Sequence, residues 1–176
     1  MFANENGRSM IEMLGVLAII GVLTVGSLNI IGRSKQMHEI GQLVSEVSRV
    51  AMTAKKMTCQ YETGYGSYTK FLYASEAYSD ALEYDDGKFV GPMDAEIVIT
   101  GDMSTFTVAV SGLTEDACIQ LVGNNWGSTG TNGFSGVCVG GGDCNPASDR
   151  QLSLNKASTL CSDDATVKLK YKACYQ

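Results

Sequence analysis

Histidine and proline are scarce in this chain, and both absences narrow its interpretation. The 176 residues include one histidine, His38, and no CxxC pair, so the usual ligand patterns of a zinc site are missing. We expect His38 to be a solvated or packed helix residue. The two prolines, Pro92 and Pro146, lie outside the N-terminal half. The length allows one modest domain rather than two.

Motifs that identify common enzyme classes are also missing. The sequence has no Walker A motif, no G-x-G-x-x-G after a strand and no complete EF-hand. The pattern S-x-x-K occurs at Ser67–Lys70 and at Ser153–Lys156, but the companion S-D-N and K-T-G motifs do not occur. We interpret both matches as chance. No catalytic residue and no cofactor is predicted, and we do not interpret the chain as an enzyme.

A few other residues could suggest a ligand site. Asp143, Asn145 and Asp149 carry oxygen ligands suited to calcium, but their spacing is not that of an EF-hand. We expect Trp126 and Tyr65 to be packing residues rather than a ligand platform. No metal site is therefore predicted.

Basic residues are fewer than acidic ones, and the difference is concentrated in the C-terminal two thirds of the chain. The chain has 13 Lys and Arg against 19 Asp and Glu, a net charge of −6. Residues 1–57 carry six basic and four acidic residues, whereas residues 58–176 carry seven and fifteen, a net −8. Nucleic-acid affinity comes largely from clustered Lys and Arg, so no nucleic-acid partner is predicted.

One long apolar run stands near the N-terminus. It extends over the nineteen residues from Met13 to Ile31. At the helical rise it spans about 28 Å, close to the hydrocarbon thickness of a bilayer. The run is too long for a secretory signal, and no A-x-A-like site closes it. We therefore expect a membrane-spanning helix.

Glu12 is the unusual residue of this region, because it lies between Ile11 and Met13 at the start of the run. A carboxylate at the centre of a membrane helix costs roughly 2.5–3.5 kcal/mol, and less near the edge. Glu12 could simply lie at the level of the lipid headgroups. Alternatively, it awaits a positive partner from another subunit, which is the default reading of an intramembrane ionisable group.

The residues around Glu12 carry a family resemblance. The segment GRSMIEML (residues 7–14), followed by LAIIGVL (residues 17–23), resembles the N-terminal signature of type IV prepilins. In that family a peptidase cuts after a leader that ends in Gly, and the new amine is methylated. The fifth mature residue is Glu. Cleavage after Gly7 would make Arg8 first and Glu12 fifth, so the register fits.

The resemblance implies a structural subunit of a type IV pilus. Glu12 would pair with the N-terminal amine of a neighbouring subunit, an ion pair that offsets two desolvation costs in lipid. The implied partners are copies of the chain in a helical filament, a prepilin peptidase, inner-membrane assembly machinery and, before assembly, membrane lipid. The implied location is the bacterial inner membrane and then the extracellular pilus. Adhesion, conjugation, DNA uptake and motility stay open.

After Ile31 the apolar residues recur at helical spacing. The predicted stripe, which faces a head domain, consists of Met37, Ile40, Leu43, Val44, Val47, Val50, Ala51, Ala54 and Met57. We therefore expect one helix from about Ser9 to Met57. The domain organisation is a leader at 1–7, a helix at 8–57 and a head at 58–176. Within the helix, residues 8–31 are the membrane or filament core and 32–57 are amphipathic.

The first part of the head combines a helix with a hairpin. Helical spacing predicts a short helix between Ser67 and Tyr84. Alternation predicts strands at Ala95–Thr100 and Ser104–Val110, joined by a turn. A short helix is expected from Thr114 to Val122. The fold class is therefore α+β, with the long helix packed on an antiparallel sheet.

The second part of the head is less regular. The Gly-rich segment Gly123–Pro146 is expected to be irregular, and Asn155–Cys161 to form a short helix. Thr166–Ala173 is the clearest strand, because apolar residues alternate with Lys168, Lys170 and Lys172. The outward lysine row suits an exposed face or a charged edge.

Six cysteines follow the apolar run and indicate disulfides in an oxidising compartment. They are Cys59, Cys118, Cys138, Cys144, Cys161 and Cys174. The head layout is similar to that of type IVb pilins, and this resemblance implies a Cys118–Cys161 bond. A local bond could join Cys138 to Cys144. Cys59–Cys174 follows only if that local bond forms, so the connectivity stays open.

Two alternatives share parts of this interpretation. A type II secretion pseudopilin has the same kind of N-terminus, but its head usually has fewer cysteines. A periplasmic enzyme or binding module on a signal anchor is a different class, and it would need a pocket with convergent groups.

Overall fold

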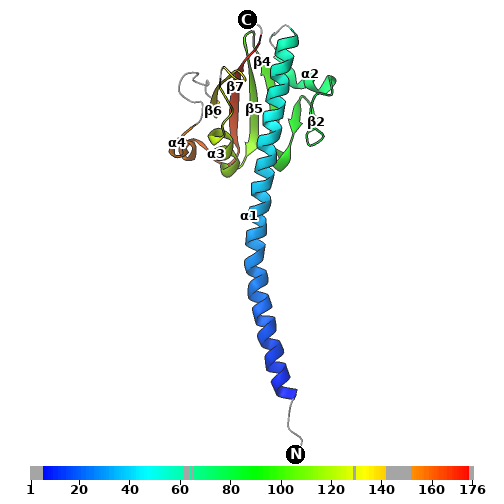
Figure 1. Ribbon diagram of the computed structural model, residues 1–176, viewed down its shortest axis with the longest axis vertical. Helices are drawn as coiled ribbons and strands as arrows, with labels where there is room; N and C mark the ends of the chain where they lie inside the picture. The colour runs from blue at the N-terminus through cyan, green and yellow to red at the C-terminus, as the bar shows by residue number, and fades with distance from the viewer. Residues whose placement is uncertain (1–5, 62–63, 65, 129, 142–151, 175–176) are drawn as a thin grey trace, which may run out of the picture. The chain divides into compact units, whose positions relative to one another are not determined.

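The chain is α+β, with one long N-terminal helix, α1 (Asn6–Gln60), and an antiparallel sheet, as seen in a computed structural model (Figure 1). The structure describes residues 6–61, 64, 66–128, 130–141 and 152–174; the side chains at 6–9 and 21–31 lie outside the description. The chain divides into two compact units, Met1–His38 and Glu39–Gln176. The predicted α+β class with an antiparallel sheet is confirmed, whereas the membrane-spanning half of the helix stays a prediction.

The helix α1 contains the whole segment predicted to be helical, and it extends three residues beyond that segment at each end. The predicted boundary between leader and helix, after Gly7, lies inside α1. Residues up to His38 belong to the first unit, and the last turns of the helix belong to the second.

The second unit is built on a seven-stranded sheet. Its strand order is β2-β3-β4-β5-β7-β6, with β1 paired to β4, and every pair is antiparallel (Figure 1). The strands are β1 (Gly66–Ser67), β2 (Glu83–Asp85), β3 (Lys88–Val90), β4 (Glu96–Gly101), β5 (Thr105–Leu113), β6 (Phe134–Val139) and β7 (Ala165–Lys172).

Short helices flank the sheet. They are α2 (Tyr68–Ala74), the 3₁₀ turn η1 (Pro92–Asp94), α3 (Glu115–Gly123) and α4 (Leu154–Leu160). As predicted, Thr114 caps α3, since its hydroxyl accepts a hydrogen bond from the amide of Ala117. Thr69 anchors α2 to the sheet, because its Oγ1 accepts a hydrogen bond from the Ile99 amide at 2.7 Å.

The core of the second unit lies between the end of α1 and the inner face of the sheet. Six of the predicted stripe residues are buried there: Ile40, Leu43, Val47, Val50, Ala51 and Ala54. Val44 and Met57 are partly buried against the core. Met37 corrects the prediction, since it is 64 % exposed and belongs to the first unit.

The helix predicted between Ser67 and Tyr84 is wrong in extent. It ends at Ala74, and Glu76 then takes a φ of 52°, which an α-helix cannot continue through. The rest of the segment forms the hairpin β2–β3. Its turn residues Asp86 and Gly87 have φ values of 40° and 90°, as a type I′ turn requires.

The segment Gly123–Pro146 is not wholly irregular, because it contains β6. This strand pairs with β7, with Val137 opposite Leu169. The register shifts between Phe134 and Gly136. Such a bulge breaks the alternation of side chains, so the strand leaves no regular period in the sequence.

Two disulfides are described in the second unit. Cys118 is bonded to Cys161, which joins α3 to the end of α4 and is buried, and Cys59 is bonded to Cys174. These are two of the three pairs considered from the sequence. Cys138 is also disulfide-bonded, and Cys144, its expected partner, lies outside the described residues.

Candidate assembly surface

Glu12 lies near the start of α1, in the first unit, with its side chain exposed. It is surrounded along the helix by eight large apolar side chains that are each 52–73 % exposed. These are Met10, Ile11, Met13, Leu14, Val16, Leu17, Ile19 and Ile20. Successive helix residues are about 100° apart, so the eight cover the whole circumference rather than one stripe.

This exposure has a large energetic consequence. Burying one side chain of this size stabilises a protein by about 1.5–3 kcal/mol, so covering all eight amounts to roughly 12–24 kcal/mol. That figure is an upper estimate, since the side chains are 52–73 % exposed and the helix already covers the rest of each. An apolar surface of this size marks a site for protein or membrane contact. Glu12 places one carboxylate within this apolar surface, so a partner that covers the surface would meet one charged group there.

A search of the described residues for membrane spans finds no helix that is long and apolar enough to cross a bilayer. The second part of the predicted span, residues 21–31, has a described helical backbone, but its side chains lie outside the description.

Gly7 and Arg8, the predicted processing residues, lie in the first turn of α1. The Arg8 side chain is outside the description. Four positions separate Arg8 from Glu12, a rise of about 6 Å on one helix, and residues at this spacing share a helix face. The backbone therefore puts the predicted new N-terminus and Glu12 in line along one face.

The two S-x-x-K matches have structural explanations. Ser67 is the N-cap of α2, and its Oγ accepts a hydrogen bond from the Lys70 amide. Ser153 is the N-cap residue of α4, and its carbonyl accepts one from the Lys156 amide. Both matches therefore coincide with helix starts.

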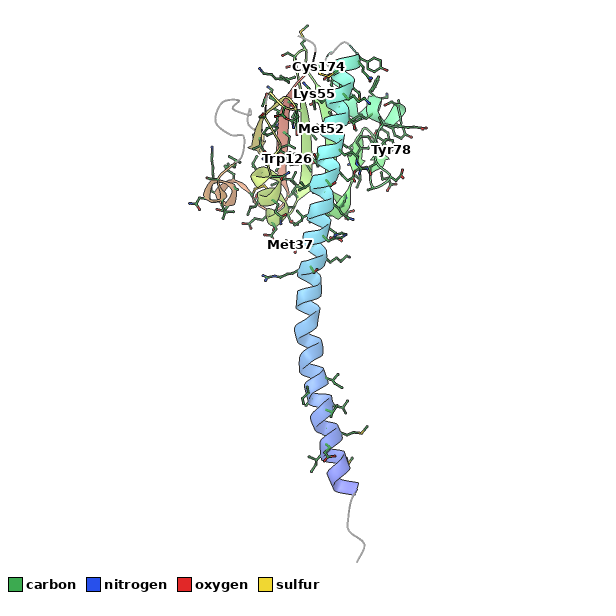
Figure 2. All side chains as sticks on the ribbon, in the orientation of Figure 1. Met37, Met52, Lys55, Tyr78, Trp126 and Cys174 are labelled. Carbon is green, nitrogen blue, oxygen red and sulfur yellow. A yellow bond between two sulfur atoms is a disulfide. The ribbon has the colours of Figure 1, made fainter. Side chains whose placement is uncertain are left out.

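The other candidate residues do not converge. His38 is exposed, and Trp126 is buried, with its Nε1 donating to the Leu121 carbonyl at 2.7 Å (Figure 2). Among the described residues no cluster of three His, Cys, Asp or Glu could hold a metal ion. Tyr65 and the calcium candidates Asp143, Asn145 and Asp149 lie outside the described residues.

Two surface hollows of the second unit have linings without a nucleophile–base pair. One, of about 620 Å³, lies beside Tyr73, Tyr78 and Tyr84, with acidic but no Ser, Cys or His side chains in its lining. Another, of about 340 Å³, lies between Met52 on α1 and the loop of Trp126 (Figure 2). Its lining has hydroxyls but neither a carboxylate nor an imidazole.

The head has two charged surfaces, one basic and one acidic, and only the basic one was predicted from the sequence. Lysines alternate with buried residues along β7, as predicted. The missed feature is the acidic segment 76–96, which carries seven Asp and Glu and one lysine, Lys88. Lys88 forms an ion pair with Glu96, and that hydrogen bond raises the pKa of Lys88. The density of acidic residues in the sequence was the signal for this surface. It was missed because the first part of the segment, up to Tyr84, was predicted to contain a helix.

A comparison with models of known protein families gives no match, and a comparison with curated proteins gives none either. The functional argument therefore depends on the chain's own residues.

Proposed function

We propose that this chain is a structural subunit of a type IVb-like pilus, and not an enzyme. In this proposal Glu12 pairs with the N-terminal amine of a neighbouring copy, and the helices of many copies form the filament core. The observation that carries it is the register of Gly7, Arg8 and Glu12 at the start of a long apolar helix.

The exposed apolar surface of the first unit supports the proposal. Eight large side chains around Glu12 are more than half exposed, and they need either lipid or other helices as cover. Before assembly that cover would be the bacterial inner membrane, in which α1 spans the bilayer. After assembly it would be the helices of neighbouring copies, packed by van der Waals contact. A prepilin peptidase and an inner-membrane assembly machine are the implied partners.

The pairing of Glu12 has a physical rationale. Removing one partner of a charged pair that is buried away from water typically costs 3–5 kcal/mol, because the other charge is left unpaired. A single acidic point on an apolar helix would therefore fix the axial register between neighbours. The disulfide-bonded head would remain outside the core as the surface of the filament.

The mature N-terminus tests this proposal. The full chain is co-expressed with a prepilin peptidase, extracted from membranes and examined by intact mass and N-terminal sequencing. The expected product begins at Arg8 and carries one added methyl group. Gly7→Leu should block cleavage, whereas Gly15→Ala, at a helix glycine with open space around it, should be cleaved as wild type is.

A chain that keeps Met1 in the presence of active peptidase would overturn the proposal and leave the signal-anchored protein as the alternative. A processed chain that forms no surface filament, but is required for secretion of other proteins, would instead indicate a pseudopilin.

A further inference from the structure

One flank of the head is strongly acidic. Residues 76–96 carry seven Asp and Glu against Lys88, a net −6 that equals the net charge of the whole chain. Six of these acids are exposed and define the acidic flank: Glu76, Asp80, Glu83, Asp85, Asp86 and Asp94. They lie on and around β2 and β3, at one end of the sheet order.

A basic strip lies on β7, one strand from the other end of the sheet order. Lys168, Lys170 and Lys172 alternate with buried residues along β7, so they project from the face opposite the core. We call these three residues the lysine strip. Their partners on β5 are Ala109, Thr107 and Thr105, which are small and uncharged. Strands β5, β6 and β7 contain no acidic residue.

The strip and the flank are separated within one subunit. Strands β4 and β5 lie between β3 and β7, so three inter-strand spacings of about 4.8 Å put roughly 14 Å between them. The Debye length in physiological salt is about 8 Å. The two patches therefore neutralise each other little within one chain. Among the described residues neither Lys170 nor Lys172 forms an ion pair.

We propose that the lysine strip of one subunit binds the acidic flank of the next copy of this chain. This inference rests on the proposed filament and names the contact between its heads. The flank lies at one end of the sheet and the strip lies one strand from the other end, so the two form a heterologous pair. Such a pair generates an open helical array or a ring rather than a closed dimer. Figure 1 shows the two ends, with β2 on one side of the head and β6 and β7 on the other.

The strip suits a second copy better than a nucleic acid. Residues 58–176 carry a net −8, so a polyanion approaching the head would be repelled over most of its surface. The three lysines of β7 are the only positive charges that the strip would offer to a nucleic acid. The flank of a neighbouring copy offers six exposed acids of opposite charge, and charged surfaces of this kind choose partner and orientation more than they add affinity.

Zero-length cross-linking tests the contact without changing a residue. Filaments are assembled from an equal mixture of unlabelled and ¹⁵N-labelled full-length protein and treated with a carbodiimide, which joins a lysine to a carboxylate that it touches. Digestion and mass spectrometry should give mixed-isotope peptides that join Lys170 or Lys172 to an acid of residues 76–94. Filaments whose mixed-isotope cross-links all join other residues would overturn the inference and leave the proposed function standing.

Charge reversal gives an independent test in the same filaments. Lys170→Glu with Lys172→Glu places like charges at the contact and should lower filament yield by about tenfold or more. Adding Glu83→Lys and Asp85→Lys, at two exposed positions of β2, restores opposite charges in the same chain and should restore yield. Lys56→Glu with Lys70→Glu is the matched control, since both lysines are exposed outside the strip and it should assemble as wild type does.

Equal yields for the Lys170/Lys172 variant and its control would refute the contact. If the wild type forms no filament at all, the proposed function fails together with this inference. The near-ultraviolet circular dichroism of each variant shows whether the head is folded, and the cross-linking result stands whether or not a variant folds.

Discussion

The Nζ atom of Lys55 donates a hydrogen bond to the carbonyl oxygen of Lys172, 117 positions later, at 2.6 Å. Two further interactions join the C-terminal end of α1 to Cys174. The Cys174 amide donates a hydrogen bond to Thr58 Oγ1 at 3.2 Å, and Cys59 forms a disulfide with Cys174. Figure 2 shows Lys55 and Cys174 at this end of the head. Three links therefore fasten the last strand to the helix.

Replacement of Lys55 should remove the hydrogen bond between α1 and the end of β7. Lys55→Met keeps most of the side-chain length but removes the donor, so the free energy of unfolding should fall by about 1–2 kcal/mol. The measurement is urea unfolding followed by circular dichroism. Lys56→Met, at the exposed neighbouring residue, is the control. Equal stability of the two variants would show that the hydrogen bond contributes nothing.

The buried Cys118–Cys161 bond should contribute substantially to stability. It joins residues 43 positions apart, and closing a loop of that length stabilises a fold by about 4 kcal/mol in the chain-entropy description. Cys118→Ala with Cys161→Ala should therefore lower the midpoint of urea unfolding strongly. A midpoint within error of the wild type would contradict the assigned role.

The described disulfides should differ in their ease of reduction. Cys59 and Cys174 are both exposed, whereas Cys118 is fully buried and Cys161 is 6 % exposed. A thiolate must reach a sulfur atom to exchange with it, so the exposed bond should open first. Rising dithiothreitol, quenching with an alkylating agent and peptide mass spectrometry give the order. Earlier alkylation of Cys118 would contradict this prediction.

Tyr171 should make the protein sensitive to alkaline pH. Its ring is 2 % exposed and stacks on Phe106, and burial raises its pKa above the ordinary 10.0. Below that pH both states hold the proton, and the stability is fully present. Above it the unfolded chain loses the proton first, so the free energy of unfolding falls by up to about 1.4 kcal/mol per pH unit.

Tyr171→Phe removes this ionisation and keeps the ring. Urea unfolding at about pH 8 and about pH 11 should show a smaller alkaline loss for this variant than for the wild type. Tyr61→Phe, at a ring that is 57 % exposed, is the matched control and should follow the wild-type curve. Identical losses in all three proteins would refute the effect of burial.

Much of the head could be predicted because its signals are local. The stripe from Ile40 to Ala54 follows helical spacing, and six of its residues are buried as expected. The hairpin of β4 and β5 and the strand β7 alternate with period two, so their buried faces were readable. Met37 was misplaced because spacing predicts which face of a helix is apolar, not where the head begins.

The missed strands depend on contacts that no local pattern records. Only three residues form each of β2 and β3, and β2 overlaps the end of the segment that was predicted to contain a helix, Ser67 to Tyr84. Asp-Gly is a strong hairpin signal, and it could have found this pair. By contrast β6 contains a bulge, and its pairing with β7 is a tertiary contact. Val137 pairs with Leu169, far along the chain, and such a long-range pairing leaves no hydrophobic periodicity in the local sequence.

Glu12, the candidate assembly residue, could be singled out from the sequence for a different reason. Glu12 is conspicuous because a carboxylate is costly among apolar residues, and the large apolar side chains beside it on α1 are exposed. The acidic flank could not be recognised as a surface before the hairpin β2–β3 was known, since a helix would have spread the same acids around its axis.

Filament yield from variants at Glu12 tests the central proposal most directly. The full chain is expressed with its assembly machinery, and filaments are sheared, sedimented and quantified. Glu12→Gln keeps the size of the side chain but removes the charge, and the proposal predicts a loss of about a hundredfold or more, while Gln42→Ala on the same helix assembles normally. A filament yield for Glu12→Gln equal to that of Gln42→Ala would contradict it.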